Sequence, residues 1–171
     1  MLDAKVQRSV RFRVGNQMIP STPIRYARQI AALPWRTTPA GEVEFLLVTS
    51  RISRNWLIPK GWPMTGRTPA QAALQEALEE AGIKGKIASR PVGRYVYDKI
   101  LKDGTVIPCS VKVFGMLVTE ELDQWEEMHQ RERHWFSQAD AAQAVTEPDL
   151  GRFLAEVDIT ARKSAWTGVL A

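Results

Sequence analysis

Residues 61–83 read GWPMTGRTPAQAALQEALEEAGI, and this segment constrains the chain more than any other. Glu76, Glu79 and Glu80 stand in it with no basic residue among them. In a helix that turns about 100° per residue, these three carboxylates fall within one arc, and the opposite arc holds Leu74, Ala77, Leu78 and Ala81. We therefore expect a helix that packs one face against a core and gathers negative charge on the other.

Local signals mark both ends of this helix. Thr68 suits the N-cap position, Pro69 suits the first helical position, and Gln71 completes a capping box with Thr68. Gly82 is the expected stop. Residues 56–58 have the composition of the end of a buried strand, and a glycine-containing turn separates them from the helix. The predicted local unit is a strand, a loop and an acidic helix.

The acidic face of this helix has two interpretations. Like charges spaced i,i+4, as Glu76 and Glu80 are, cost an isolated helix about 0.2–0.5 kcal/mol, so a nearby cation would stabilise the arrangement. A divalent metal such as Mg²⁺, which prefers oxygen ligands, is one such cation. The alternative is a solvated glutamate face, because surface glutamates are common.

Loop and helix together resemble the Nudix box, whose family pattern is G-x5-E-x7-R-E-U-x-E-E-x-G-U, where U is a bulky aliphatic residue. Gly61 takes the place of the first glycine and Ile83 that of the last aliphatic residue. The three glutamates and Gly82 also match the pattern. The resemblance favours the metal-binding interpretation of the acidic face.

The chain departs from the family pattern at three positions. Arg67 replaces the early glutamate, Gln75 replaces the arginine before Glu76, and Ala77 replaces the next aliphatic residue. In the family, the first two positions are thought to brace the loop against the helix. The resemblance therefore leaves the metal-binding glutamates intact and puts the brace in question.

Segments outside the box extend the resemblance to residues 24–157. LIPKGWPMTG, GRYVYDK and residues 133–136 are similar to a bacterial branch that resembles diphosphoinositol polyphosphate phosphohydrolases and diadenosine polyphosphate hydrolases. The resemblance implies an α/β (α+β) fold, a Nudix-type α/β/α sandwich with a mixed sheet. It also implies hydrolysis of a phosphoanhydride bond in a nucleoside or inositol polyphosphate, with Mg²⁺ or Mn²⁺ as the cofactor.

The same resemblance assigns roles to the residues of the box. Glu76, Glu79 and Glu80 would hold the metal, with the backbone carbonyl of Lys60 or Gly61 as a further ligand. Glu79 would also position the attacking water or act as the general base. A carboxylate within residues 120–127 is the alternative base.

The distribution of charge bears on the substrate. The chain carries a net charge of +4, and the helix at 68–81 contributes −3, so the rest of the chain carries +7. A basic surface around an acidic site suits a polyanion. Nucleic acid is disfavoured as a partner, because the sequence has no basic helix and no aromatic RNA-binding motif. The candidate substrate-binding cations lie in or beside loops near the box, namely Arg51, Arg54, Lys60, Lys99 and Lys102.

Three segments are expected along the chain. Residues 1–22 form a basic extension, residues 23–160 a single domain, and residues 161–171 a C-terminal tail. The extension would be flexible or add an edge strand, and a transit peptide is the less favoured alternative.

The cellular location is expected to be cytoplasmic. No apolar run approaches the ~20 residues that span a bilayer. The single cysteine, Cys109, excludes an internal disulfide framework, which fits a reducing compartment, and its apolar strand setting predicts a packing role. The sequence leaves the oligomeric state open.

Alternating strand and helix signals fill the predicted domain. A turn is expected at residues 102–105, and Pro108 would interrupt the following strand or place it at an edge. Ser137 with Asp140 should cap a second helix, and residues 149–159 should form a third. Strands are predicted at residues 26–36, 43–51, 86–90, 92–99, 106–118 and 132–136.

Other functions remain open alongside hydrolysis of a polyphosphate. The fold could bind a polyphosphate without turning it over, as the changes at Arg67 and Gln75 would allow. It could also act on a nucleoside diphosphate sugar or an RNA 5′ end, or associate with RNA through its basic exterior. Among the six tryptophans, Trp62 lies within the loop of the box and is the candidate for contact with a substrate.

Overall fold

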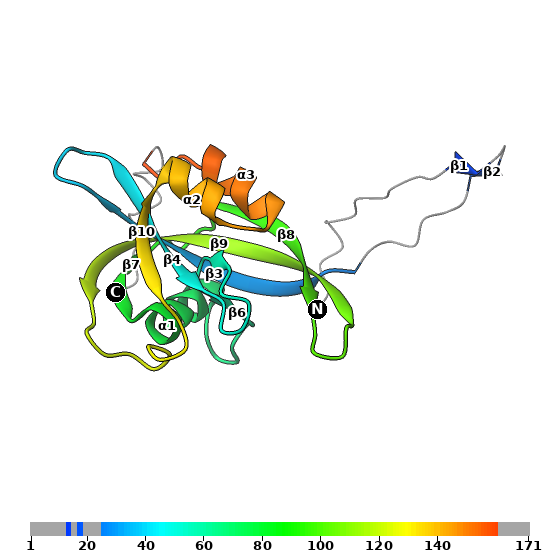
Figure 1. Ribbon diagram of the computed structural model, residues 1–171, viewed down its shortest axis with the longest axis horizontal. Coiled ribbons are helices and arrows are strands. Elements are labelled where there is room, and N and C mark those ends of the chain that lie inside the picture. The colour runs from blue at the N-terminus through cyan, green and yellow to red at the C-terminus, as the bar shows by residue number, and fades with distance from the viewer. Residues whose placement is uncertain (1–12, 15–16, 19–24, 161–171) are drawn as a thin grey trace.

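One mixed sheet of eight strands forms the centre of the domain (Figure 1). The computed structural model describes residues 13–14, 17–18 and 25–160. Within the sheet, β3 and β9 run parallel, and the other strand pairs run antiparallel. The main path follows the order β10 (Arg133–Ser137), β4 (Val43–Thr49), β3 (Ala27–Thr37), β9 (Val106–Glu121) and β7 (Ile83–Ile87).

Two short strands lead the chain into the helix of the box. β5 (Trp56–Leu57) pairs with β4, and β6 (Lys60–Gly61) pairs with β3. The chain thus crosses from one strand to the next just before the loop, and Ala32 N donates a hydrogen bond of 3.0 Å to Pro59 O at the crossing. The pairing of β6 with β3 places Gly61, the first glycine of the box, beside Ile30 of the central strand.

Helices cover both faces of the sheet. Helix α1 (Pro69–Ala81) lies on one face, and α2 (Gln138–Ala144) and α3 (Pro148–Glu156) lie on the other (Figure 1). The predicted α/β/α sandwich with a mixed sheet is confirmed. Because both faces are covered, the middle strands carry continuous apolar runs rather than an alternating pattern. The fully buried runs are residues 30–33 of β3 and residues 45–48 of β4.

Strand β7 differs from its predicted position. The sequence predicted a strand at 86–90, but the strand spans Ile83–Ile87. Gly82 has a left-handed backbone (φ 61°), which turns the chain so that Ile83 can pair at once with Glu121. The third helix also ends earlier than predicted, at Glu156 rather than residue 159.

The hairpin between β8 (Gly93–Ile100) and β9 has the predicted turn. Leu101 N donates to Thr105 O at 2.8 Å, and Gly104 has a positive φ of 82°. Pro108 lies opposite Asp98 in the part of β9 that precedes its pairing with β3, so its missing N–H interrupts no ladder on that side. Cys109 is fully buried, as its predicted packing role requires.

Little of the N-terminal extension falls within the described residues. There, β1 (Arg13–Val14) pairs antiparallel with β2 (Gln17–Met18). The remainder of the predicted extension, at 1–22, and the predicted tail at 161–171 lie outside the described part of the chain. Within the described part, no helix has the length and apolar character needed to cross a membrane.

Candidate active site

The predicted caps of α1 are present. Thr68 Oγ1 accepts a hydrogen bond from Gln71 N at 3.2 Å, and Gln71 Oε1 accepts one from Thr68 N at 2.8 Å. The cap satisfies two backbone N–H groups that the first turn would otherwise leave free. These contacts fix where the helix begins, and therefore where the three glutamates lie relative to the loop.

Glu76 lies directly against the first glycine of the box. Its carboxylate occupies the space beside the Gly61 Cα, so a Cβ at position 61 would overlap it. Gly61 therefore serves a close approach between a backbone and a side chain. Pairing of β6 with β3 holds Gly61 in position, and the missing side chain of Gly61 leaves room for the Glu76 carboxylate.

Glu80 is buried, so the alternative interpretation of a solvated glutamate face does not hold at this position. It is only 7% exposed, its Oε2 accepts a hydrogen bond of 3.1 Å from Lys60 N, and its Oε1 forms an ion pair with Arg131. A charged carboxylate is tolerated in such a place only when it is paired and hydrogen-bonded. The cation and the backbone amide therefore explain how Glu80 can face inward.

Arg131 joins Glu80 to a fourth carboxylate, that of Glu127. Its Nε donates to Glu127 Oε2, and its Nη1 donates to Thr49 O at 2.9 Å. Arg51 Nη1 lies 3.6 Å from the other oxygen of Glu127. Sequence reasoning missed Arg131, although its i,i+4 spacing from Glu127 was a signal for an ion pair.

At Gln75, one of the two altered brace positions, the side chain contacts another residue of the same helix. Gln75 Nε2 donates a hydrogen bond to Glu79 Oε1. Arg67, at the other altered position, is exposed in the loop, where its backbone N donates to Met64 O at 3.2 Å. Glu79 is thus held by a neutral amide at the position where the family pattern has an arginine.

The crowding of carboxylates changes their protonation. Burial, together with the nearby charges of Glu80, Glu79 and Glu127, raises the pKa of Glu76 from 4.5 to about 7. Burial also raises the pKa of Glu80, against the opposing pull of Arg131. Four carboxylates in one region form a set of hard oxygen ligands that suits Mg²⁺. Within the described residues, no three such side chains converge closely enough to hold an ion, so binding requires side-chain movement, first of all at Glu80.

The raised pKa of Glu76 predicts how Mg²⁺ binding depends on pH. A carboxyl whose pKa is higher in the folded protein stabilises the fold below about pH 4.5 and loses that contribution as the pH rises through about 7. Binding of Mg²⁺ needs the carboxylate, so the rise in Tm caused by Mg²⁺ should be small at pH 6 and large above about pH 7.5. Thermal unfolding with Mg²⁺ and with EDTA across this range measures it. The same pH profile in Glu76→Gln would show that another group is responsible.

Two of the candidate substrate-binding lysines lie over aromatic rings. Lys60 Nζ lies 4.9 Å from the ring centroid of Tyr97, and Lys99 Nζ lies 4.8 Å from that of Trp62. Burial lowers the pKa of Lys60, against the pull of Glu80. Among the described residues, no carboxylate lies within ion-pair distance of either ammonium. Neither lysine is therefore engaged by a carboxylate of the described residues, although burial disfavours the charged form of Lys60.

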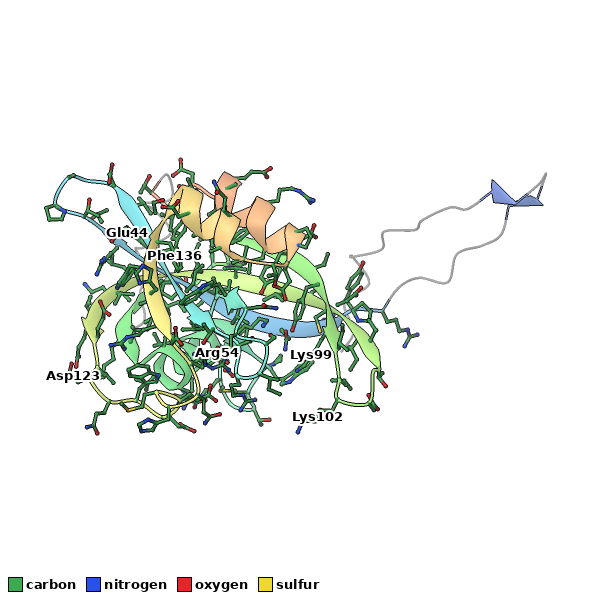
Figure 2. The ribbon with its side chains drawn as sticks, in the orientation of Figure 1. Glu44, Arg54, Lys99, Lys102, Asp123 and Phe136 are labelled. Atoms are coloured by element: carbon green, nitrogen blue, oxygen red, sulfur yellow. The ribbon has the colours of Figure 1, made fainter. Side chains whose placement is uncertain are left out.

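The other candidate cations are placed differently. Figure 2 shows Lys102 towards the tip of the β8–β9 hairpin, beyond Lys99. Arg54 forms an ion pair with Glu132 and donates to Gln130 O at 2.8 Å. The structure thus brings Lys60 and Lys99 together, leaves Lys102 at the hairpin tip, and gives Arg54 partners within the protein.

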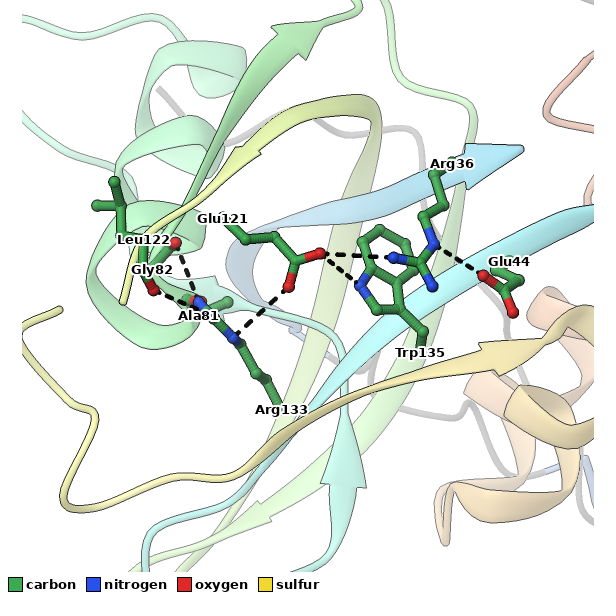
Figure 3. Close-up of polar contacts among 8 residues, drawn as sticks. All are labelled: Arg36, Glu44, Ala81, Gly82, Glu121, Leu122, Arg133 and Trp135. Carbon is green, nitrogen blue, oxygen red and sulfur yellow. Dashed lines mark hydrogen bonds and ion pairs between the residues drawn. The ribbon is translucent and has the colours of Figure 1, made fainter. Parts of the chain in front are cut away.

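The carboxyl end of α1 is held by Arg133 from β10 (Figure 3). Its Nη1 donates to Ala81 O at 2.7 Å and to Gly82 O at 3.1 Å, and its Nη2 donates to Leu122 O at 2.9 Å. A cation at this end satisfies helix carbonyls and complements the negative end of the helix dipole. The helix that carries the glutamates is therefore fixed at both ends.

Comparison with known proteins agrees with this geometry. A family model described as NUDIX domain matches residues 27–157, which is most of the chain. The chain belongs to the Nudix family. Diphosphoinositol polyphosphate phosphohydrolase 3-beta from Bos taurus is 32% identical to this Nudix chain over 132 residues, which cover 76% of each protein.

Other Nudix relatives are larger or more distant. Nudix hydrolase 12, mitochondrial, from Arabidopsis thaliana is 34% identical over 103 residues, covering 58% of this chain and 51% of the relative. The chain thus spans about half the length of that relative. A crystal structure of a C. elegans Ap4A hydrolase superposes with a TM-score of 0.57 at 24% identity, covering 77% of this chain and 95% of that one, and it supports the fold.

Proposed function

We propose that this Nudix chain hydrolyses a phosphoanhydride bond in a nucleoside or inositol polyphosphate, with Mg²⁺ as its cofactor. The observation that carries the proposal is the gathering of Glu76, Glu79 and Glu80 of α1 with Glu127 beside the glycine loop. Mg²⁺ held there would neutralise charge on the phosphate oxygens, which is the main need of phosphoryl chemistry. Mn²⁺, another hard divalent ion, could replace it.

The glutamates of the site are proposed to bind the metal and to activate the attacking water. Glu76, Glu79 and Glu80 would hold the metal, with the carbonyl of Lys60 or Gly61 as a further ligand. Glu79 would also accept the proton of the attacking water. Glu127 is the alternative base, because it is the carboxylate of residues 120–127 that adjoins Glu80 through Arg131. The pH–rate profiles of Glu79→Gln and Glu127→Gln distinguish the two candidates. The variant that loses the acidic limb of the profile identifies the general base.

The substrate is proposed to carry several phosphates. Among the described residues, Lys60 and Lys99 have no carboxylate within ion-pair distance, and Lys99 lies over the ring of Trp62, which follows Gly61 in the sequence. A phosphate chain on the metal could extend over these lysines, with Arg51 as a further contact. Relatives named for diphosphoinositol polyphosphate and Ap4A support the same substrate class.

Catalytic efficiency should therefore rise with the number of phosphates on the substrate and fall with salt. Lys99→Ala or Lys102→Ala should raise KM several-fold for a polyphosphate and leave KM for ADP-ribose unchanged, since the pull of a cation is screened beyond about 10 Å at 0.1 M ionic strength. Lys86→Ala on β7 is a matched control. Steady-state rates at low and high salt measure these effects. A two-phosphate compound as the best substrate, with no effect of the lysines, would contradict the polyphosphate assignment.

A panel of substrates tests the proposal as a whole. The purified protein is incubated with Mg²⁺ or Mn²⁺ and diadenosine polyphosphates, nucleoside triphosphates, ADP-ribose, diphosphoinositol phosphates or 5′-triphosphorylated RNA. Hydrolysis of a polyphosphate is the expected result. Binding without metal-dependent product release would instead identify a binding module, which the neutral Gln75–Glu79 contact makes worth testing.

The organisation and location of the chain are also proposals. We place one Nudix domain at residues 23–160, flanked by the basic extension and the tail, and we propose that the protein acts in the cytoplasm. The buried thiol of Cys109 is compatible with a reducing compartment. Fluorescent tagging at the C-terminus would locate the protein without masking the basic N-terminus.

A further inference from the structure

We propose that Arg131 is the positioning residue of this site, keeping the carboxylates of Glu80 and Glu127 next to each other beside the place where Mg²⁺ would bind. The family pattern has an arginine within the helix where this chain has Gln75. Here a guanidinium comes instead from the segment before β10. The inference rests on the proposed function, because it concerns the same carboxylates.

The guanidinium uses all three of its nitrogens. Nη2 pairs with Glu80 of α1, Nε pairs with Glu127 of the β9–β10 connection, and Nη1 donates to Thr49 O at the end of β4. The side chain is only 7% exposed. A planar fork with fixed donor directions can satisfy three partners from three elements at once, whereas the single ammonium of lysine cannot reproduce this geometry.

The backbone around Arg131 is held by hydrogen bonds that do not involve the Arg131 side chain. The neighbouring Glu132 N donates to Thr49 Oγ1 at 2.9 Å, and Thr49 N donates to Glu132 O at 2.9 Å. Glu127 N also donates to Glu79 O at 3.2 Å. The backbone therefore brings Glu127 to the helix and Arg131 to β4, and a variant at 131 should keep this frame.

Without the guanidinium, Glu80 would keep no ion pair among the described residues, and Glu127 would keep only the longer one with Arg51, at 3.6 Å. Glu80 is buried and Glu127 is half-buried, so their repulsion would be weakly screened by solvent. The two carboxylates would move apart, and this movement would disturb the site. Arg131 thus acts through the two glutamates, and it is not expected to touch the substrate.

Arg131→Met tests the proposal through stability as well as turnover. We expect Tm to fall by about 4 °C or more in EDTA, since a buried ion pair loses its cation. The increase in Tm on adding Mg²⁺ should exceed that of the wild type, because the metal then supplies the missing charge. At saturating Mg²⁺, kcat should fall about tenfold or more with little change in KM. Arg131→Lys should recover part of both losses.

Arg152→Met is the matched control. Arg152 on α3 also pairs with a carboxylate, that of Asp149 at 2.9 Å, but its side chain is exposed and it lies across the sheet from α1. This variant should leave the Mg²⁺-dependent change in Tm as in the wild type. An equal loss of Tm in EDTA and in Mg²⁺ for Arg131→Met, or a wild-type kcat, would overturn the positioning role.

A double-mutant cycle in EDTA needs no turnover. Arg131→Met and Glu80→Gln should each lower Tm, and the double variant should lose clearly less than the two losses added together, because both changes break one contact. Additive losses would overturn the proposal. If no substrate is hydrolysed by the wild type, the proposed function fails, and this cycle still decides whether Arg131 holds Glu80.

Discussion

Glu76→Gln should lower Mg²⁺-supported kcat about a hundredfold or more and leave the metal-free protein as stable as the wild type, or more so. The carboxylate rests against Gly61, and its pKa is raised to about 7 by burial and by the neighbouring glutamates. Its charge therefore works against the fold above that pH, and the neutral amide removes the repulsion without changing the volume. Titration of activity with Mg²⁺, together with thermal unfolding in EDTA, measures both effects.

Glu80→Gln tests whether Glu80 stabilises the fold in addition to supporting turnover. We expect a similar loss of kcat but also a loss of about 1–3 kcal/mol in the free energy of unfolding, because Arg131 and Lys60 N lose a charged partner. A solvated Glu80, as in the alternative interpretation of the acidic face, would show no such loss of stability. Near-wild-type turnover of both variants at saturating Mg²⁺ would rule out these glutamates as metal ligands.

Gly61→Ala should be nearly as damaging to turnover as loss of Glu76 itself. The added Cβ would overlap the Glu76 carboxylate, and strand pairing of Gly61 with Ile30 prevents the backbone from withdrawing. We expect little loss in the free energy of unfolding, because the end of the flexible Glu76 side chain can move aside, but a fall in kcat of about a hundredfold as the carboxylate is displaced.

The double variant Gly61→Ala with Glu76→Ala provides the control for this clash. Removing the glutamate side chain makes room for the new Cβ, so any loss of stability in Gly61→Ala should disappear, and turnover should be no lower than in Glu76→Ala alone. Chemical denaturation of the wild type, both single variants and the double variant measures the recovery. If Gly61→Ala is as active as the wild type, Glu76 does not depend on the close approach at this glycine.

Helix α1 could be predicted almost to the residue because its signals are local. Thr68 and Gln71 form their cap within four residues, and Gly82 ends the helix through its own backbone angle. Turns with similar local signals, such as the one at Gly104, were also predicted correctly. The strand β7 was displaced because its start depends on pairing with Glu121, far along the chain.

The environment of the glutamates could not be predicted by the same reasoning. A helical arc indicates which side chains share a face, and it does not show what another segment places over that face. Arg131, 51 residues after Glu80, pairs with it in the interior, and no signal near Glu80 in the sequence indicates this partner. The contact between Lys60 and Tyr97 likewise depends on the sheet order. Sequence reasoning found the three helix glutamates and missed the cation that pairs with Glu80.

The most direct test of the account is the rate of product formation from a polyphosphate substrate, measured as a function of Mg²⁺ concentration for the wild type and for Glu76→Gln. The account predicts no turnover in EDTA, saturable activation of the wild type by Mg²⁺, and a kcat at least about a hundredfold lower for the variant at every Mg²⁺ concentration. Equal rates for the two proteins, or hydrolysis that persists in EDTA, would contradict it.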